Sequence, residues 1–548
     1  MSDPAHVDVS APFTISDVVR ASQGAALNLS REDAFRLDAT RESLIESLVR
    51  NPRRVYGFNT GFGDNRNGPT IPTGQLGLIQ DNLILSHASG TGGAIDNRVV
   101  RAALALRARS LTLGHSGVRS KVVTALCQLA NSGLVPVVPK FGSVGASGDL
   151  APLSHLVLPL MGKGTVDDNG TRLEARVNLL AERGVERLCY RPAEEFEGVE
   201  GPESTFGPKE GLALNNGTAF MAAHLALAVH EFENVLWHAD LALALNIEAL
   251  CGVMDAMEVN VQELRAHKGI NASAARVSDF LKDSRLTIQE GTGDGFALDS
   301  RTRDGVLDST QDDYCLRCGP VVHGTAWDAL ESVKETVEIE LNSVTDNPLV
   351  FGDQVLSGSH FHGMPLSFAA DQLRTAMAIV GGISERRIAK LMNDKRNYGL
   401  PRHLVLDDPL GIKSGWMIAQ YSAASMVNEL KTRSMPYCVG NVTTGNESED
   451  FVSMGANSCR AAYEMVEVLR HIVSVELAAA VRGILIRIER TSTPSDLSGW
   501  EDRLSSRAQA VVATFVDRGI EVWHDDDRPL NGLFDAASAL VAEQGLRD

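Results

Sequence analysis

Apolar residues recur at intervals of three and four along the second half of the chain, and this spacing predicts long helices. The clearest stretch is 218–256, where Ala, Leu, Met and Glu dominate and Gly252 is the only interior helix breaker. Similar stretches lie at 321–343, 366–394, 412–433 and 451–489. Helices of this length predict a large helical bundle, since the apolar positions are too broad for the narrow seam of a coiled coil.

The first part of the chain has a different pattern, with frequent Gly, Pro and Asn. Loops of this composition are expected at 59–74, 135–152 and 194–208. Short β-branched segments such as 164–166 predict only minor strand content. We therefore predict a mostly α fold in two domains, residues 1–210 and residues 211–548.

Composition narrows the class of protein. The 548 residues include 51 Lys+Arg and 70 Asp+Glu, a formal net charge of −19, which argues against a nucleic-acid binder. Hydrophobic residues make up 44%, a globular balance that excludes wholesale disorder. No apolar run reaches the ~18–20 residues that span a bilayer, and the N-terminus lacks a signal-peptide pattern. With seven cysteines, an odd number, we expect a cytoplasmic protein without a disulfide framework.

The segment 142–155 reads GSVGASGDLAPLSH and is the best candidate for chemistry. Its simplest interpretation is a Gly-rich turn that opens a helix at Asp149. It lacks the spacing of both common phosphate-binding loops, and 145–149 departs from a nucleophile elbow at its fifth position. A third interpretation uses the backbone of Ala146, Ser147 and Gly148. Because Gly148 has no Cβ, its nitrogen can approach the Ala146 carbonyl carbon. Cyclisation with loss of one water, followed by loss of a second water from the Ser147 side chain, would give an electrophilic methylidene on an imidazolone ring.

This segment resembles the aromatic amino-acid ammonia-lyases and aminomutases, whose 4-methylideneimidazole-5-one group (MIO) forms autocatalytically from Ala-Ser-Gly. Further blocks match the family in order, from about Val55 to about Leu485. They are VYGFNTGFG at 55–63, KEGLALNNGT at 209–218, QDDYCLRC at 311–318, ELNSVTDNPLV at 340–350, FHG at 361–363 and EDFVSMG at 449–455. The resemblance implies the fumarase-like helical architecture of the family, in which residues 1–210 carry the MIO and residues 211–548 form a long-helix bundle and oligomerisation domain.

The resemblance also implies roles for site residues. Tyr56 takes the place of the general base; since its ordinary pKa is ~10, we expect local positive charge or the electron-poor site to ionise it partly. Asn216 contacts the MIO carbonyl oxygen, and Arg317 suits a bidentate clamp on the substrate carboxylate. Tyr314 and Gln311 complete the polar shell. Phe361 belongs to the FHG block and is counted with the catalytic residues.

Two positions bear on the substrate. Ser86-His87 resembles the ring-recognition pair of histidine-specific members, although some tyrosine aminomutases share it. Glu449 also resembles the histidine enzymes, and a carboxylate there would accept an imidazole N–H, whereas beside a phenyl ring its burial would be costly. Alternatively, Glu449 is a solvated acid in the run 447–450. The agreement of His87 and Glu449 favours histidine.

Other features depart from the histidine pattern. Ser448 and Phe451 flank Glu449 where Gln and His are usual, Ser359-His360 replaces Gly-Asn, and Ala219 stands where Gln is common. Lyase and aminomutase outcomes therefore both stay open, with tyrosine as a second substrate. Cys315-x-x-Cys318 lacks further ligands nearby, so no metal site is expected. A helical scaffold without catalysis is a further, non-enzymatic alternative.

The prediction from sequence is therefore an MIO-dependent ammonia-lyase that converts L-histidine to trans-urocanate. An MIO-dependent 2,3-aminomutase making a β-amino acid, or a tyrosine ammonia-lyase, is the alternative. The resemblance implies a homotetramer with active sites shared between subunits, no nucleic acid and no membrane.

Overall fold

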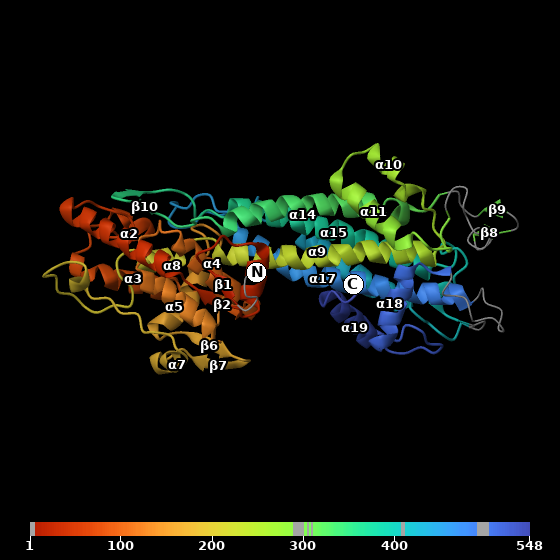
Figure 1. Ribbon diagram of the computed structural model, residues 1–548, viewed down its shortest axis with the longest axis horizontal. Coiled ribbons are helices and arrows are strands. Elements are labelled where there is room, and N and C mark those ends of the chain that lie inside the picture. The colour runs from red at the N-terminus through yellow and green to blue at the C-terminus, as the bar shows by residue number, and fades with distance from the viewer. Residues whose placement is uncertain are drawn as a thin grey trace. The chain divides into compact units, whose positions relative to one another are not determined.

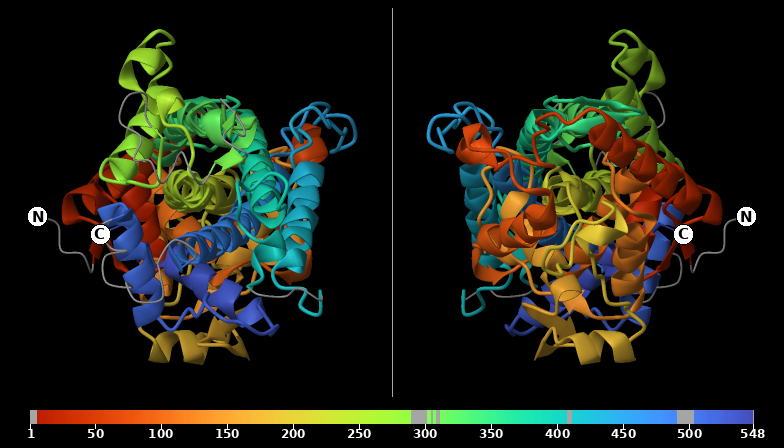
Figure 2. Two further views of the ribbon diagram at one scale, coloured as in Figure 1. Left: turned by 90° about the vertical axis from the view of Figure 1, so that its right-hand side faces the viewer. Right: turned by 90° about the vertical axis from the view of Figure 1, so that its left-hand side faces the viewer.

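The protein is mostly helical, as the periodicity predicts. The computed structural model describes residues 6–288, 301–303, 306–307, 311–406, 411–489 and 503–547. Coiled ribbons dominate in Figures 1 and 2, and the arrows are few and short. Among the described residues, no helix is both long enough and apolar enough to cross a membrane.

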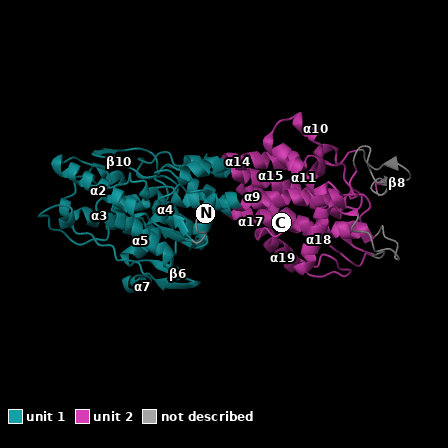
Figure 3. Cartoon of the chain, viewed as in Figure 1, with its two compact units in different colours: residues 1–230, 333–371, 436–463 teal, residues 231–332, 372–435, 464–548 magenta. Residues whose placement is uncertain are grey.

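The chain forms two compact units, which are coloured separately in Figure 3. Unit 1 comprises Met1–His230, Val333–Asp371 and Pro436–Tyr463. Unit 2 comprises Glu231–Ser332, Gln372–Met435 and Glu464–Asp548. Each unit is therefore assembled from three stretches of chain, and the predicted domain boundary at residue 210 stays a prediction.

Within the part of the chain that the structure describes, four helices are longer than twenty residues, and each has residues in both units. They are α9 (Ala219–Ala249), α14 (Gly319–Leu341), α15 (Met364–Met392) and α17 (Gly455–Glu489). Together with α16 (Met417–Arg433), they correspond one to one with the five predicted long helices. The helical interpretation of the second half is confirmed.

The ends of these helices differ from the predicted ones by a few residues, and backbone conformation explains why. Helix α9 ends at Ala249 because Cys251 adopts a positive φ of 48° and the Gly252 N–H bonds back to the Ile247 carbonyl at 2.8 Å. Helix α16 begins only after Gly415, whose φ is 57°, and α17 begins after Met454, whose φ is 53°.

Shorter helices complete each unit. Unit 1 also contains α1 (Ile15–Ser22), α2 (Arg31–Arg50), α3 (Leu76–His87), α4 (Asn97–Thr112), α5 (Ser120–Asn131), α6 (Leu150–Val157), α7 (Val177–Glu182) and α8 (Glu210–Asn215). Unit 2 also contains α10 (Val259–Glu263), α11 (Lys268–Leu281), α13 (Tyr314–Arg317), α18 (Ser506–Asp517) and α19 (Asn531–Ala542).

Strands are short and form small, separate sheets. The pairs are parallel β1 (His6–Asp8) with β2 (Ala26–Asn28), and antiparallel β3 (Thr91–Ala94) with β5 (Pro139–Phe141), β10 (Leu349–Phe351) with β11 (Gln354–Leu356), and β8 (Thr302–Arg303) with β9 (Val306–Leu307). The three-stranded sheet has the order β4 (Val135–Pro136), β6 (Thr165–Asp168), β7 (Thr171–Glu174). Its β6–β7 hairpin turns at Asn169-Gly170, both with positive φ, as a two-residue hairpin requires. The predicted minor strand content is confirmed.

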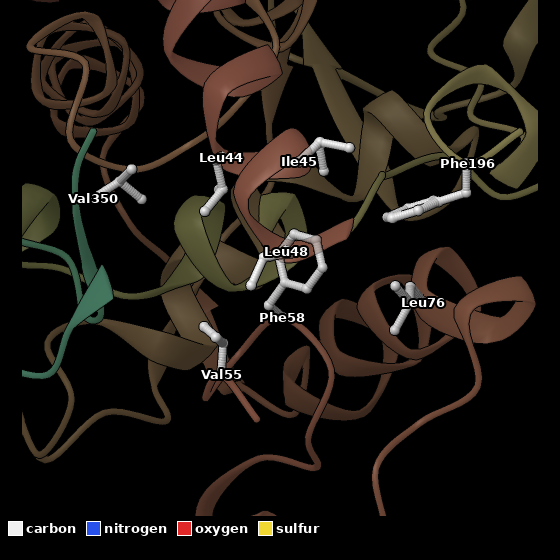
Figure 4. Packing of buried hydrophobic residues seen from close by; sticks show 8 residues of the cluster. All are labelled: Leu44, Ile45, Leu48, Val55, Phe58, Leu76, Phe196 and Val350. Carbon is white, nitrogen blue, oxygen red and sulfur yellow. The ribbon is translucent and has the colours of Figure 1, made fainter. Parts of the chain in front are cut away.

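A buried cluster in unit 1 holds the segment that precedes the first predicted loop. Leu44 and Leu48 of α2 pack with Val55, Phe58 and other apolar side chains, as Figure 4 shows. Val55 and Phe58 are buried in this cluster. Tyr56, which directly follows Val55, is therefore carried on a fixed piece of backbone.

Candidate active site

The Ala146-Ser147-Gly148 loop of unit 1 is held by residues that precede helix α17. The Met454 N–H donates to the Val144 carbonyl at 2.9 Å, and the Ser453 hydroxyl donates to the Gly145 carbonyl at 2.9 Å. Gly145 has a φ of 67°, and a Cβ on it would lie 2.2 Å from the Ser453 oxygen. The loop therefore needs glycine at this position to approach its support.

Gly148 packs directly against the backbone of Gly217. Its φ is 73°, and an added Cβ would lie 2.1 Å from the Gly217 carbonyl oxygen. The next residue, Asp149, donates its N–H to the same oxygen at 2.7 Å. Asn216, which is buried, donates its side-chain amide to the Ser147 carbonyl oxygen at 3.2 Å. The loop thus fits a group made from Ala-Ser-Gly, since Gly148 lies where no side chain fits and an amide donor contacts Ser147.

Asp149 connects this loop to the start of α9. It is the N-terminal flanking residue of α6, as predicted, and its carboxylate also accepts the N–H groups of Phe220 and Met221 at 2.9 and 3.0 Å. Burial raises the pKa of Asp149 to about 7. Behind it, the buried Arg107 donates to the Asn216 carbonyl at 3.0 Å. Asn216 is therefore held at its carbonyl by Arg107 and at its side-chain amide by the Ser147 carbonyl.

A cavity of about 580 Å³ opens over Ser147. Six predicted site residues line it, namely Tyr56, Ala146, Ser147, Asn216, Phe361 and Glu449. Its lining also includes residues that the sequence did not single out for this site, among them Arg54, Arg66, Asn347, His362 and Phe451. Unit 1 therefore brings together side chains from five distant parts of the sequence.

Glu449 lies beside Ser147 and is itself held in place. The Ser147 hydroxyl donates to Oε1 of Glu449 at 3.0 Å, and the Thr444 hydroxyl donates to Oε2 at 2.8 Å. Backbone hydrogen bonds in both directions between Thr444 and Glu449 close the intervening turn. Glu449 is half-buried and hydrogen-bonded within the cavity, so it is not the freely solvated acid of the alternative interpretation.

Tyr56 is half-buried, and its hydroxyl accepts the Gly63 N–H at 3.2 Å. Burial, with a further contribution from the Glu449 carboxylate, raises the pKa of Tyr56 above its ordinary value, and the nearby Arg66 only partly opposes this. Within unit 1, desolvation thus outweighs the positive charge of Arg66. Partial ionisation of Tyr56 by local positive charge or by the electron-poor site stays a prediction.

His87 ends helix α3 and lines a different cavity, of about 610 Å³, together with residues of the 59–74 loop such as Phe62 and Ile71. Its Nδ1 lies 3.0 Å from the Ser86 hydroxyl. Burial lowers the pKa of His87, and the charge of Glu449 acts in the opposite direction. His87 is thus within electrostatic range of Glu449 without sharing its cavity.

Gln311, Tyr314 and Arg317 belong to unit 2. Arg317 donates from Nε to the Asp312 carbonyl at 3.0 Å, and its guanidinium carbon lies 4.8 Å from the centre of the Tyr314 ring. Tyr314 is 70% exposed. The turn that carries both is fixed through Asp313, which pairs with Lys390 and Arg396, each at 2.9 Å.

Several residues of the Ser147 cavity were missed by sequence reasoning. Nε2 of His362 lies 3.1 Å from the Phe451 carbonyl, and the two rings stack with centroids 6.5 Å apart. Arg54 donates to the carbonyls of Arg66 and Gly68 and so shapes the loop beyond Tyr56. Arg54 directly precedes the matched block 55–63 and His362 lies within the FHG block 361–363, and this placement is the signal that could have found them. Within the described residues, no three His, Cys, Asp or Glu side chains are grouped to hold a metal ion.

The model of the aromatic amino acid lyase family matches residues 13–506. A histidine ammonia-lyase of Deinococcus radiodurans is 40% identical over 469 residues, which cover 85% of this chain and 82% of that protein. Among solved structures, a histidine ammonia-lyase from Trypanosoma cruzi is 32% identical with a TM-score of 0.82, covering 99% of this chain and 94% of its own. A tyrosine aminomutase from Streptomyces globisporus is 30% identical with a TM-score of 0.85, covering 99% and 97%.

Proposed function

The chain belongs to the aromatic amino acid lyase family, and from this premise we propose that it eliminates ammonia from L-histidine to give trans-urocanate. It is accordingly a carbon–nitrogen lyase. Histidine is favoured by the name of the 40% identical relative and by the Glu449 carboxylate in the Ser147 cavity.

The observation that carries the substrate proposal is the contact between Ser147 and Glu449. A carboxylate 3.0 Å from the serine hydroxyl, inside a half-enclosed cavity, is suited to accept an N–H of an imidazole ring. Beside a phenyl ring the same carboxylate would gain no hydrogen bond from the substrate to offset its desolvation. Glu449 thus selects for a substrate ring that donates a hydrogen bond.

We propose that Ala146, Ser147 and Gly148 form the MIO. The Gly148–Gly217 packing and the Asn216 amide on the Ser147 carbonyl support this, since cyclisation leaves that carbonyl as the ring oxygen. The group supplies an electrophilic methylidene carbon for the substrate amine. The Asn216 amide would hold the ring oxygen, and the contacts of Ser453 and Met454 keep the loop in place.

The remaining residues bind and orient the substrate or move its proton. Tyr56 is the base that removes the β-proton, and since burial raises its pKa, its phenolate form is favoured only at alkaline pH. Arg317 binds the substrate carboxylate through its planar fork, with Tyr314 and Gln311 completing the polar shell. Phe361 gives the cavity an aromatic wall.

We further propose a homotetramer in the cytoplasm, with active sites that draw residues from more than one subunit. The 70% exposure of Tyr314 supports this, because a substrate-binding tyrosine is expected to be covered in the working enzyme. None of the seven cysteines, all of which lie within the described residues, forms a disulfide bond, which is consistent with a reducing compartment.

The second candidate function is a 2,3-aminomutase, on histidine or tyrosine, or a tyrosine ammonia-lyase. Its support is the likeness to the Streptomyces tyrosine aminomutase and the Ser86-His87 pair. The test is incubation of the purified full chain with L-histidine, with Ser147→Ala as the control. Formation of urocanate and ammonia by the wild type alone supports the proposal, and a β-amino acid as the main product contradicts it.

A further inference from the structure

A second cavity, of about 460 Å³, adjoins the Ser147 cavity in unit 1. Both cavities are lined by Ser359 and His362. The second is also lined by His115, His360 and Glu340, none of which has a role in the proposed elimination. The chain thus has a second compartment, with histidines and a carboxylate among apolar side chains such as Leu349 and Phe351, next to the place where ammonia would be released.

The histidines of this compartment are acceptors in their neutral form. Nδ1 of His115 lies 2.9 Å from the Val350 carbonyl, and Nδ1 of His360 lies 3.1 Å from the Val344 carbonyl. A carbonyl oxygen can only accept, so each Nδ1 carries the proton and each Nε2 has a free lone pair. By the same reasoning His362, whose Nε2 bonds to a carbonyl, keeps its lone pair on Nδ1.

Glu340 adds a carboxylate near the C-terminal end of α14. Its Oε1 accepts the hydroxyl of Thr218 at 2.5 Å, whereas Oε2 accepts no hydrogen bond from the described residues. Thr218 directly follows Asn216 and Gly217, the pair that contacts the Ser147 loop. The carboxylate is therefore fixed to the backbone segment that supports the reaction site.

The polar part of this lining, which offers lone pairs and one carboxylate, matches a small ligand that has only donors and carries positive charge. Ammonium has four N–H donors and no acceptor, whereas a transition metal requires a tighter group of ligands than the described residues offer. We propose that the Glu340–His360 compartment binds the ammonium ion released by the elimination. The proposed function is needed to explain where the ammonium ion comes from, whereas binding of the ion does not depend on that function.

The direct test is thermal unfolding of the full chain in ammonium chloride, with sodium and potassium chloride at equal ionic strength. A ligand that binds only the folded state raises Tm. We expect ammonium to raise the Tm of the wild type more than either control salt does. Glu340→Gln and His360→Leu should lose this difference, and Glu338→Gln, an exposed residue of the same helix, should keep it.

A kinetic arm measures inhibition of histidine turnover by added ammonium. Losing one charged hydrogen bond should raise the inhibition constant about tenfold in Glu340→Gln. An active enzyme without an ammonium-specific Tm shift would overturn the compartment and leave the proposed function standing. An inactive enzyme that shows the ammonium-specific Tm shift, with the shift lost in Glu340→Gln, would overturn the proposed function and leave the ammonium compartment standing. Equal stabilisation by potassium would overturn the assignment to ammonium.

Discussion

The hydroxyl of Ser147 donates a hydrogen bond of 3.0 Å to the carboxylate of Glu449, 302 positions later in the chain. This contact joins the residue proposed to form the prosthetic group to the residue proposed to recognise the substrate ring. A second hydroxyl, from Thr444, holds the other oxygen of the carboxylate at 2.8 Å. Prosthetic-group formation and ring recognition therefore depend on one small region of unit 1.

Replacing Ser147 with alanine should leave the fold intact and reduce turnover by at least about a thousandfold, because the covalent electrophile cannot form. Intact-protein mass spectrometry of the wild type should show a mass lower by two waters than the sequence mass, and the variant should show no loss. Wild-type-like rates in Ser147→Ala would rule out the covalent mechanism.

Glu449→Gln should reduce kcat/KM for histidine by about ten- to a hundredfold, since a charge-assisted hydrogen bond to the ring is replaced by a neutral one. Turnover of tyrosine should fall much less. Glu447→Gln, in the same turn but exposed, serves as the matched control and should change neither value. Equal losses for both substrates in Glu449→Gln would remove this residue from ring recognition.

The pH profile of kcat/KM should rise toward alkaline pH, because burial and Glu449 both raise the pKa of Tyr56 and the base acts as phenolate. Removing the Glu449 charge should shift that rise to lower pH, as one of the two causes is lost. Tyr56→Phe should abolish the alkaline rise together with most activity. If Glu449→Gln does not shift the pH profile of kcat/KM, a group other than Tyr56 is responsible for the alkaline rise.

Gly148→Ala should prevent prosthetic-group formation and lower Tm, because its Cβ would lie 2.1 Å from the Gly217 carbonyl at a φ of 73°. Gly170→Ala is the control that separates the two effects. Its φ is 89° but nothing lies within 4 Å, so it should cost only the ~1 kcal/mol of backbone strain. Similar Tm losses in both variants would show that the close contact between Gly148 and Gly217 does not determine the stability of the loop.

Glu210 at the start of α8 should make stability pH-dependent in acid. Burial alone would raise its pKa, but Arg119, whose guanidinium bonds it at 2.6 and 2.7 Å, lowers that pKa from 4.5 to about 2. A depressed folded-state pKa gives a stabilisation that is complete above pH ~4.5 and lost as the pH falls toward ~2, about 3 kcal/mol in all.

Glu210→Gln should therefore lower the free energy of unfolding at pH 7 and flatten its dependence between pH ~4.5 and ~2 in chemical denaturation. Glu182→Gln, on the exposed side of α7, is the control and should follow the wild type. An unchanged acid slope in Glu210→Gln would contradict the assignment.

The sequence predicted most of what local pattern determines. The long helices follow from the periodicity of apolar residues. Their ends are shifted by Cys251, Gly415 and Met454, whose positive φ values could not be predicted from the sequence pattern. The matched blocks identified six of the residues that line the Ser147 cavity. What the blocks could not reveal is distance in space, such as the bond between Ser147 and Glu449 or the placement of His87 in a neighbouring cavity.

The protonation of the site residues could not be predicted from the sequence either. Ionisation of Tyr56 was expected from the chemistry, yet the balance between one arginine and burial is a property of the folded chain. The tautomers of His115 and His360 likewise depend on carbonyl oxygens more than a dozen residues away in sequence.

The central claim is histidine elimination, and one competition measurement tests it most directly. The purified full chain is incubated with equal concentrations of L-histidine, L-tyrosine and L-phenylalanine, and the products are separated and identified over time. The account predicts urocanate and stoichiometric ammonia as the first and main products. Preferential formation of a product from tyrosine or phenylalanine, or of any β-amino acid, would contradict it.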